Sequence, residues 1–156
     1  MKPEGGTSSR RLVYAKAADL ELWHCRPLGN IKILDLKDRV AGHLNGILLD
    51  AETKRPLFLV IERDRSAGQC FLAPVGESWF DQTERAIRID IDRRQVTEFD
   101  QRRFEQMSQE EALAYEREVL GQCCPEVGFH RDGTPDYERL ESFRCPNWLQ
   151  ASPVAT

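Results

Sequence analysis

The chain has 156 residues, of which 40% are hydrophobic and 31% are charged, and its formal net charge is -4 at pH 7. This composition predicts one folded domain with an ordinary core and excludes a fully disordered chain. The negative charge argues against strong general binding to nucleic acid, which usually depends on clustered Lys and Arg. The sequence shows neither an apolar stretch approaching the roughly 20 residues of a membrane span nor a signal peptide, so we expect a cytoplasmic protein.

Residues 1–27 are predicted to form a partly disordered N-terminal segment. The ends, residues 1–11 (MKPEGGTSSRR) and 151–156 (ASPVAT), have the small and polar composition of fraying termini. Between Leu12 and Arg26 the apolar residues fit either a short helix or a strand, and both alternatives remain open.

Three adjacent strands are predicted between Ile31 and Ile61, with very short connections. The stretch Val40–Asp50 reads as one long strand with a bulge at Gly46. The pair Asn45-Gly46 is also a hairpin signal, but the arms of such a hairpin would be too short to cross a sheet.

The next turn is predicted from polar residues that can bond nearby backbone N–H groups, here Asp50 and Thr53. Pro56 can begin the third strand without breaking a ladder hydrogen bond, and the apolar run after it predicts a strand buried on both faces. A fourth strand is expected from Cys70 to Val75, ending near Pro74.

The segment Arg85–Asp92 alternates between isoleucines and charged residues, which predicts a half-exposed strand that closes one side of a barrel. The isoleucines Ile87, Ile89 and Ile91 share one face. On the other face, Arg88, Asp90 and Asp92 are expected to form cross-strand ion pairs rather than a cation site.

Two helices are predicted after the strands. Asp100 can cap the first, with Phe99 and Phe104 placed as a hydrophobic staple. Ser108 and Glu111 form a capping box for the second, from about Gln109 to Gly121, whose apolar arc should dock on the barrel or on a partner. The tail residues expected to anchor the C-terminal segment are Tyr137, Leu140, Phe143 and Trp148.

The pattern of these strands resembles the PRC-barrel family. The matching features are Asp35 in the first strand, the VAGHL entry to the second, Asp50 with Thr53 in the turn, and the run Leu57–Glu62. The resemblance extends through FLAPV and the isoleucine strand to FDQRRF, over residues 28–107. It implies a small barrel that docks onto proteins or assemblies, as do the reaction-centre H subunit and a ribosome maturation factor of that family; it transfers no functional residues.

Chemistry-bearing clusters are few in the sequence. Cys123, Cys124, His130 and Cys145 are ligand types that zinc prefers, with His24 and Cys25 as further candidates. The paired C-x-x-C knuckle is missing, so free thiols are the preferred interpretation and no metal or other cofactor is predicted.

Catalysis is not predicted either. His43 is expected to face solvent or form a hydrogen bond in its strand, and no nucleophile with an adjacent base is visible. The basic pairs Arg63/Arg65, Arg93/Arg94 and Arg102/Arg103 have acidic neighbours and are interpreted as surface charge, with RNA contact as the alternative. The aromatic pair Trp79-Phe80, expected in a loop, could either anchor an interface or plug the end of a barrel.

The predicted fold is mainly β: a small, partly open antiparallel barrel over residues 28–98, followed by a helical extension and tail over residues 99–156. The predicted function is a non-catalytic adaptor that binds another protein or itself, with Trp79 and Phe80 as the interface residues and a homodimer as one option. The alternatives are an RNA-linked ribosome-assembly accessory protein and a metal- or redox-sensing module that uses the C-terminal cysteines.

Overall fold

The long strand β5 (Val40–Asp50) organises the sheet. One of its edges pairs with β6 (Pro56–Arg63). Its other edge is shared by two strands, β4 (Lys32–Leu34) along the first half and β1 (Leu12–Lys16) along the second half. This computed structural model describes residues 11–17, 21–22, 26–27, 31–63, 68–90 and 97–149, so the ends predicted to be disordered lie outside the described residues except for Arg11.

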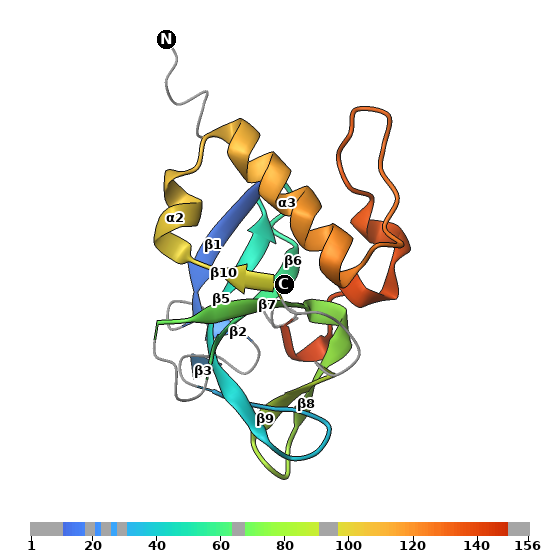
Figure 1. Cartoon of the computed structure of the whole chain (residues 1–156). Coiled ribbons are helices and arrows are strands. Elements are labelled where there is room, and N and C mark those ends of the chain that lie inside the picture. The colour runs from blue at the N-terminus through green and yellow to red at the C-terminus, as the bar shows by residue number, and fades with distance from the viewer. Residues whose placement is uncertain are drawn as a thin grey trace.

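Eight strands form one mixed sheet in the order β10–β7–β6–β5–β4–β9–β8, with β1 beside β5 (Figure 1). The remaining strands of this sheet are β7 (Cys70–Pro74), β8 (Ser78–Asp81), β9 (Ala86–Ile89) and β10 (Thr97–Phe99). A separate two-stranded pair consists of β2 (Glu21–Leu22) and β3 (Arg26–Pro27). In the part of the chain that the structure describes, β8 and β10 end the sheet at opposite edges and it does not close.

The chain is therefore mainly β, as predicted, but the prediction of a purely antiparallel sheet was wrong. β4 and β9 run parallel, with Ile33 beside Ile87 and Leu34 beside Arg88. The alternation of apolar and polar residues defines which face of a strand is buried, but it carries no information on the direction of a neighbour that lies far away in the sequence. The local pattern of Arg85–Asp92 therefore could not distinguish the two directions.

The bulge in β5 confirms that this segment is one strand rather than a hairpin. Its pairing with β6 passes from Leu44 directly to Gly46, so Asn45 is the extra residue. A Cβ atom at Gly46 would lie 2.5 Å from the carbonyl oxygen of Ala15 and 2.6 Å from the ring of Tyr14. Glycine at this position therefore allows β1 to approach β5 closely.

The turn between β5 and β6 has the predicted side-chain bonds. Asp50 Oδ1 accepts the backbone N–H groups of Glu52 at 2.8 Å and Thr53 at 3.0 Å. Thr53 Oγ1 accepts the N–H of Arg55 at 3.2 Å, and Pro56 begins β6 as expected. β7 likewise ends at Pro74.

Both predicted helix starts are confirmed. Asp100 caps α2 (Gln101–Gln106), and the rings of Phe99 and Phe104 lie 5.4 Å apart as a hydrophobic staple. α3 (Gln109–Cys123) begins with the capping box of Ser108 and Glu111. These caps fix where α3 starts and therefore which of its faces meets the sheet.

Side chains on the two faces of the sheet belong to two hydrophobic cores. Along β6, Phe58 and Val60 point into a helix-side core with α3, whereas Leu59 and Ile61 point into an inner core. The inner core also contains side chains of β4, β5, β7 and β9, so these strands share one hydrophobic core. β6 is thus buried on both faces, as its apolar run predicted. In Figure 1, α3 crosses the part of the sheet that contains β1, β5 and β6.

The C-terminal segment packs against both cores. Its short 3₁₀ turns are η3 (Tyr137–Arg139), η4 (Glu141–Phe143) and η5 (Asn147–Leu149); another, η2 (Val75–Glu77), follows β7. Tyr137 and Phe143 are buried in the helix-side core and Trp148 in the inner core, which confirms the predicted anchors. The indole N–H of Trp148 donates to Ser78 Oγ at 3.1 Å.

Candidate functional site

The aromatic pair Trp79-Phe80 lies in β8, the last strand at one edge of the sheet, and not in a loop as predicted. Within the described chain, β8 pairs only with β9. The Trp79 side chain is 45% exposed, whereas Phe80 is half-buried and packs against the inner core. The two aromatics therefore have different environments, because adjacent residues of a strand point to opposite faces.

Trp79 lies at the end of a row of side chains that crosses four strands. It is directly opposite Arg88 of β9, which is beside Leu34 of β4, which is in turn opposite Val40 of β5. Val40 is 41% exposed, and Leu36, in the turn that follows β4, is 48% exposed. We call Trp79, Leu36 and Val40 the edge patch. Only Trp79 could be singled out from the sequence, since Leu36 and Val40 flank a charged turn.

The edge patch contains most of the large hydrophobic side chains that are exposed in the described residues. The other two are Val13 on β1 and Phe129 in the C-terminal segment. Exposed apolar residues that stand singly are ordinary on a soluble protein, and Arg88 and the buried Leu34 separate Trp79 from Val40, so Trp79 on the edge strand is the main candidate of the three.

Arg88 connects β8 to the turn that carries Leu36. Its guanidinium lies 2.7 Å from Asp81 Oδ2 and 2.6 Å from Asp38 Oδ1, and it donates to the carbonyl oxygen of Asp35 at 3.1 Å. These hydrogen bonds lower the pKa of Asp81 and raise the pKa of Arg88, so both remain charged and mutually compensated at neutral pH. The pair between Arg88 of β9 and Asp81 of β8 is one of the cross-strand ion pairs predicted for this face, and Asp92 lies outside the described residues.

The turn itself is held by the buried carboxylate of Asp35. Asp35 Oδ1 accepts the backbone N–H groups of Lys37 and Arg39, and Oδ2 contacts the Arg39 guanidinium at 2.8 Å. Burial alone would raise the pKa of Asp35, but these hydrogen bonds outweigh it and the pKa is lowered. The turn therefore presents Leu36 on a rigid support.

The predicted ligand residues are not brought together. Cys123 and Cys124 are buried in the helix-side core, Cys145 packs against the inner core, and His130 is 56% exposed. His24 and Cys25 lie outside the described residues. Among the residues with assigned positions, no group of three or more His, Cys, Asp or Glu side chains is placed to hold a metal ion. His43 is exposed on β5, as predicted.

The basic pairs can be placed only in part. Arg63 forms an ion pair with Glu98 at 2.6 Å, and Arg102 and Arg103 are exposed on α2. Arg65, Arg93 and Arg94 lie outside the described residues. No helix in the described chain has the length and apolar character needed to cross a membrane.

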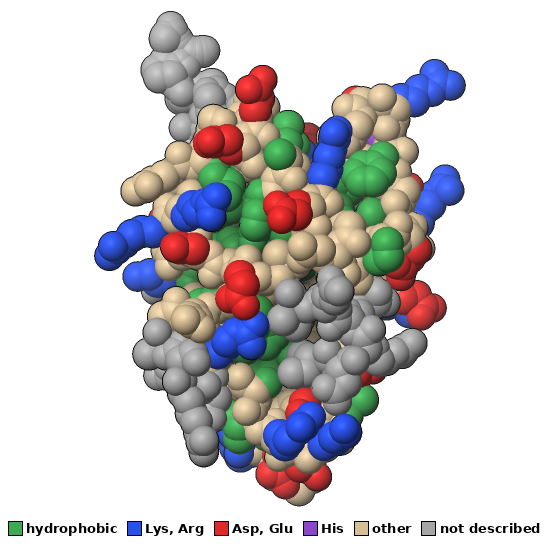
Figure 2. Space-filling view, viewed as in Figure 1, with side chains coloured by type: hydrophobic (Ala, Val, Ile, Leu, Met, Phe, Trp, Pro, Cys, Tyr) green, Lys and Arg blue, Asp and Glu red, His purple; other side chains and the backbone are tan. Residues whose placement is uncertain are grey.

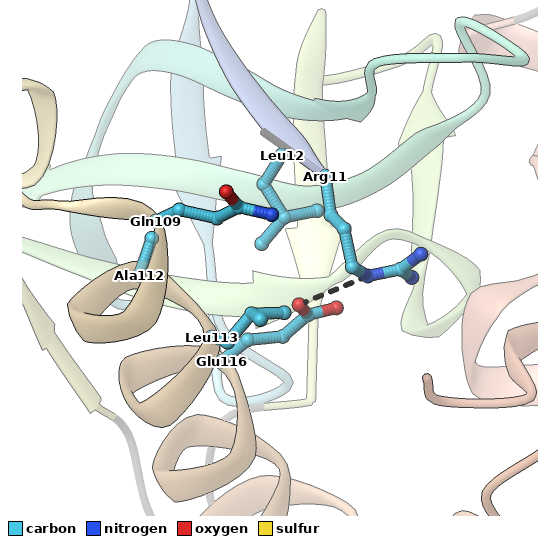
Figure 3. A pocket seen from close by; sticks show the side chains of 6 residues that line it. All are labelled: Arg11, Leu12, Gln109, Ala112, Leu113 and Glu116. Atoms are coloured by element: carbon cyan, nitrogen blue, oxygen red, sulfur yellow. Dashed lines mark hydrogen bonds and ion pairs between the residues drawn. The ribbon is translucent and has the colours of Figure 1, made fainter. Parts of the chain in front are cut away.

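A buried carboxylate that sequence analysis missed joins three segments behind α3. Glu116, only 2% exposed, accepts hydrogen bonds from the Tyr137 hydroxyl and from Arg11 Nε, the latter at 3.3 Å. Figure 3 shows Arg11 reaching from the start of β1 across a small cavity to Glu116 on α3. Burial, followed by the charge of Glu116, raises the pKa of Tyr137, so its phenol remains a donor. The cavity holds at most about one water, so this group of residues is structural.

Comparison with known proteins adds no identification. No family model matches the chain, and no curated protein matches it. The candidate function therefore depends on the residues described above.

Proposed function

We propose that this protein is a non-catalytic interaction module of the PRC-barrel type that binds another protein through the β8 edge of its sheet. The observation that carries the proposal is Trp79, which is 45% exposed on the outermost strand. Large aromatic side chains are typical energetic anchors of protein interfaces.

The barrel type is supported by the inner core. Five strands contribute aliphatic or aromatic side chains to it, and Trp148 and Leu149 of the C-terminal segment are buried in the same core. The bulge at Asn45 supplies the bend that a curled sheet needs. Because the interior is filled in this way and α3 packs on the other face, the edges of the sheet are the surfaces on which we expect a partner to dock.

The chemistry of the edge patch suits an extended apolar segment of a partner. An edge strand can accept a further strand through its backbone, while side chains on alternate positions select the sequence. In such a complex, Trp79 would contact an apolar side chain on the partner strand that pairs with β8. Arg88, opposite Trp79, is paired with Asp38 and Asp81. These ion pairs leave little net charge beside Trp79 to attract a charged partner.

Site-specific photo-crosslinking tests this proposal. A photoreactive phenylalanine analogue is placed at residue 79, and in a matched variant at residue 13, since Val13 is also an exposed strand residue, 41% accessible, but belongs to β1. In an extract of the producing cells, we expect a discrete crosslinked protein from position 79 that is absent from position 13.

The result would contradict the proposal if neither position gave a product, or if both gave the same set. A product with twice the mass of the chain would identify the partner as a second copy. Mass spectrometry of the excised product distinguishes this homodimer from a complex with a different protein.

A further inference from the structure

A groove lies at the opposite edge of the sheet, between β10, the start of β7, and the two helices. It has a volume of about 660 Å³ and continues into a second hollow of about 400 Å³ along α2 and α3. The two share Arg103, Met107, Tyr115 and Glu118 as lining residues, so they form one continuous surface, the helix groove. Figure 2 shows hydrophobic side chains between acidic and basic ones over this region.

The aromatic floor of the helix groove is fixed in position; Phe99 and Phe104 are buried in it and Tyr115 is its partly exposed member. Phe99, Phe104 and Tyr115 pack with ring centroids 5.4 to 6.4 Å apart. The Tyr115 hydroxyl donates to the carbonyl oxygen of Glu98 at 2.7 Å, which ties α3 to β10. Thr97 Oγ1 and Gln122 Oε1, 2.8 Å apart, make a second tie between the same elements. The groove is therefore formed before any ligand arrives, which lowers the cost of binding.

The titratable groups in the groove suit non-covalent binding. Burial, with the nearby charges of Glu62, Asp100 and Glu98, raises the pKa of the Cys70 thiol to about 11. Burial also raises the pKa of the Tyr115 phenol. Both groups keep their protons at neutral pH, so the thiolate that nucleophilic attack requires is scarce.

The charge of the lining is mostly negative. Four carboxylates line the two hollows, Glu98, Asp100, Glu111 and Glu118, against the single guanidinium of Arg103. Asp100 and Glu111 also cap helices, and Glu98 pairs with Arg63, whereas Glu118 is an exposed residue of α3 on the lining of both hollows. An aromatic floor with a negative rim is complementary to an apolar side chain flanked by cations.

We propose that the helix groove is a second docking site, which binds a short basic segment of a partner protein, with Lys or Arg at the carboxylates and an apolar side chain on the aromatic floor. This inference goes beyond the function proposed for the edge patch and does not depend on it. β8 and β10 are at opposite ends of the strand order, so the two sites lie on opposite edges of the sheet. A protein that binds at both edges would join two partners.

The test uses the full chain and a fluorescein-labelled peptide composed of Arg, Leu and Gly, with a matched peptide in which Glu replaces Arg. We expect saturable binding of the basic peptide that weakens with added salt, and no binding of the acidic one. Backbone amide NMR should show shift changes at residues of the groove, including Arg103, Tyr115 and Glu118.

Two variants with the same change of charge separate a specific site from general attraction. Glu118→Lys should weaken binding of the basic peptide by about fivefold or more, because one exposed ion pair is replaced by a repulsive pair of cations. Glu52→Lys, in the exposed turn between β5 and β6, should leave it unchanged. Trp79→Ala should also leave it unchanged, which separates this site from the edge patch.

Three results would overturn the inference. They are a dissociation constant above about 1 mM for the basic peptide, shift changes outside the groove, and equal losses in Glu118→Lys and Glu52→Lys. A failure of the photo-crosslinking at residue 79 would leave peptide binding at the groove unaffected, so the two proposals fail separately.

Discussion

The two edge strands of the sheet, β10 and β8, have different surroundings. At β10, α2 and α3 lie beside the edge, and the Tyr115 hydroxyl donates a hydrogen bond to the backbone carbonyl oxygen of Glu98. At β8, no described strand lies beyond the edge, and Trp79 is 45% exposed. An exposed strand edge is a site of unwanted pairing unless it is covered or used. The chain itself covers the β10 edge, whereas at the β8 edge we propose that a partner protein takes this role.

The largest effect is expected from removing the aromatic packing at the covered edge. Phe104 is 2% exposed and contacts Phe99 and Tyr115. Phe104→Ala should lower the free energy of unfolding by about 4 kcal/mol, because it leaves a cavity under the helices. Urea unfolding monitored by circular dichroism measures this, with the exposed Gln106→Ala on the same helix as the control. A loss below about 1 kcal/mol would show that the helices do not depend on this packing.

The next largest effect is expected at the buried carboxylate that holds α3 to β1 and the C-terminal segment. Glu116→Ala should lower the free energy of unfolding by about 3 kcal/mol, because Tyr137 and Arg11 lose their acceptor. Glu116→Gln should cost less, since an amide oxygen can still accept the Tyr137 hydroxyl. Equal losses in the two variants would show that the hydrogen bond contributes nothing beyond the charge.

A smaller, pH-dependent effect is expected in the turn that supports the exposed edge. The pKa of Asp35 is lower in the folded protein than the ordinary value of about 3.9, so its ionised form stabilises the fold above that pH. This contribution is lost as the pH falls through the folded pKa. Asp35→Asn should therefore cost about 1 kcal/mol at pH 7, and the difference from the unsubstituted protein should shrink as the pH falls through the folded pKa of Asp35. Thermal unfolding across this range measures it, and a difference independent of pH would contradict the assignment.

The smallest effect on stability is expected at Trp79 itself. Trp79→Ala should change the free energy of unfolding by less than about 0.5 kcal/mol, as is usual for exposed positions, while it abolishes partner binding at the β8 edge. Urea unfolding and capture of the crosslinked partner report the two properties separately. A large loss of stability would place Trp79 in the core and remove the contrast between the two edges.

Local signals explain why part of this fold could be predicted. Asp50 with Thr53, Asp100 and the pair Ser108 and Glu111 act on neighbouring backbone groups, so their roles can be read from adjacent residues. The apolar run after Pro56 likewise predicted a strand buried on both sides.

Features that depend on distant residues could not be predicted. β8 and β10 have four and three residues, too few for a period to be recognised. Glu116 looks like an ordinary polar helix residue until Tyr137 and Arg11 are placed beside it. Of the edge patch, Trp79 could be singled out because large aromatics are conspicuous, whereas Leu36 and Val40 gain their significance only from the pairing of β4 with β9.

The sharing of one edge of β5 by β4 and β1 has a consequence for the integrity of the protein. β4 pairs with residues 40–43 and β1 with residues 46–50, so neither strand can substitute for the other. Proteolytic removal of the first seventeen residues would expose the backbone of Gly46–Asp50. This stretch contains Leu48, whose side chain is fully buried in the intact protein. A truncated chain would then present an apolar strand on which further copies could nucleate, which makes an intact β1 a safeguard against aggregation.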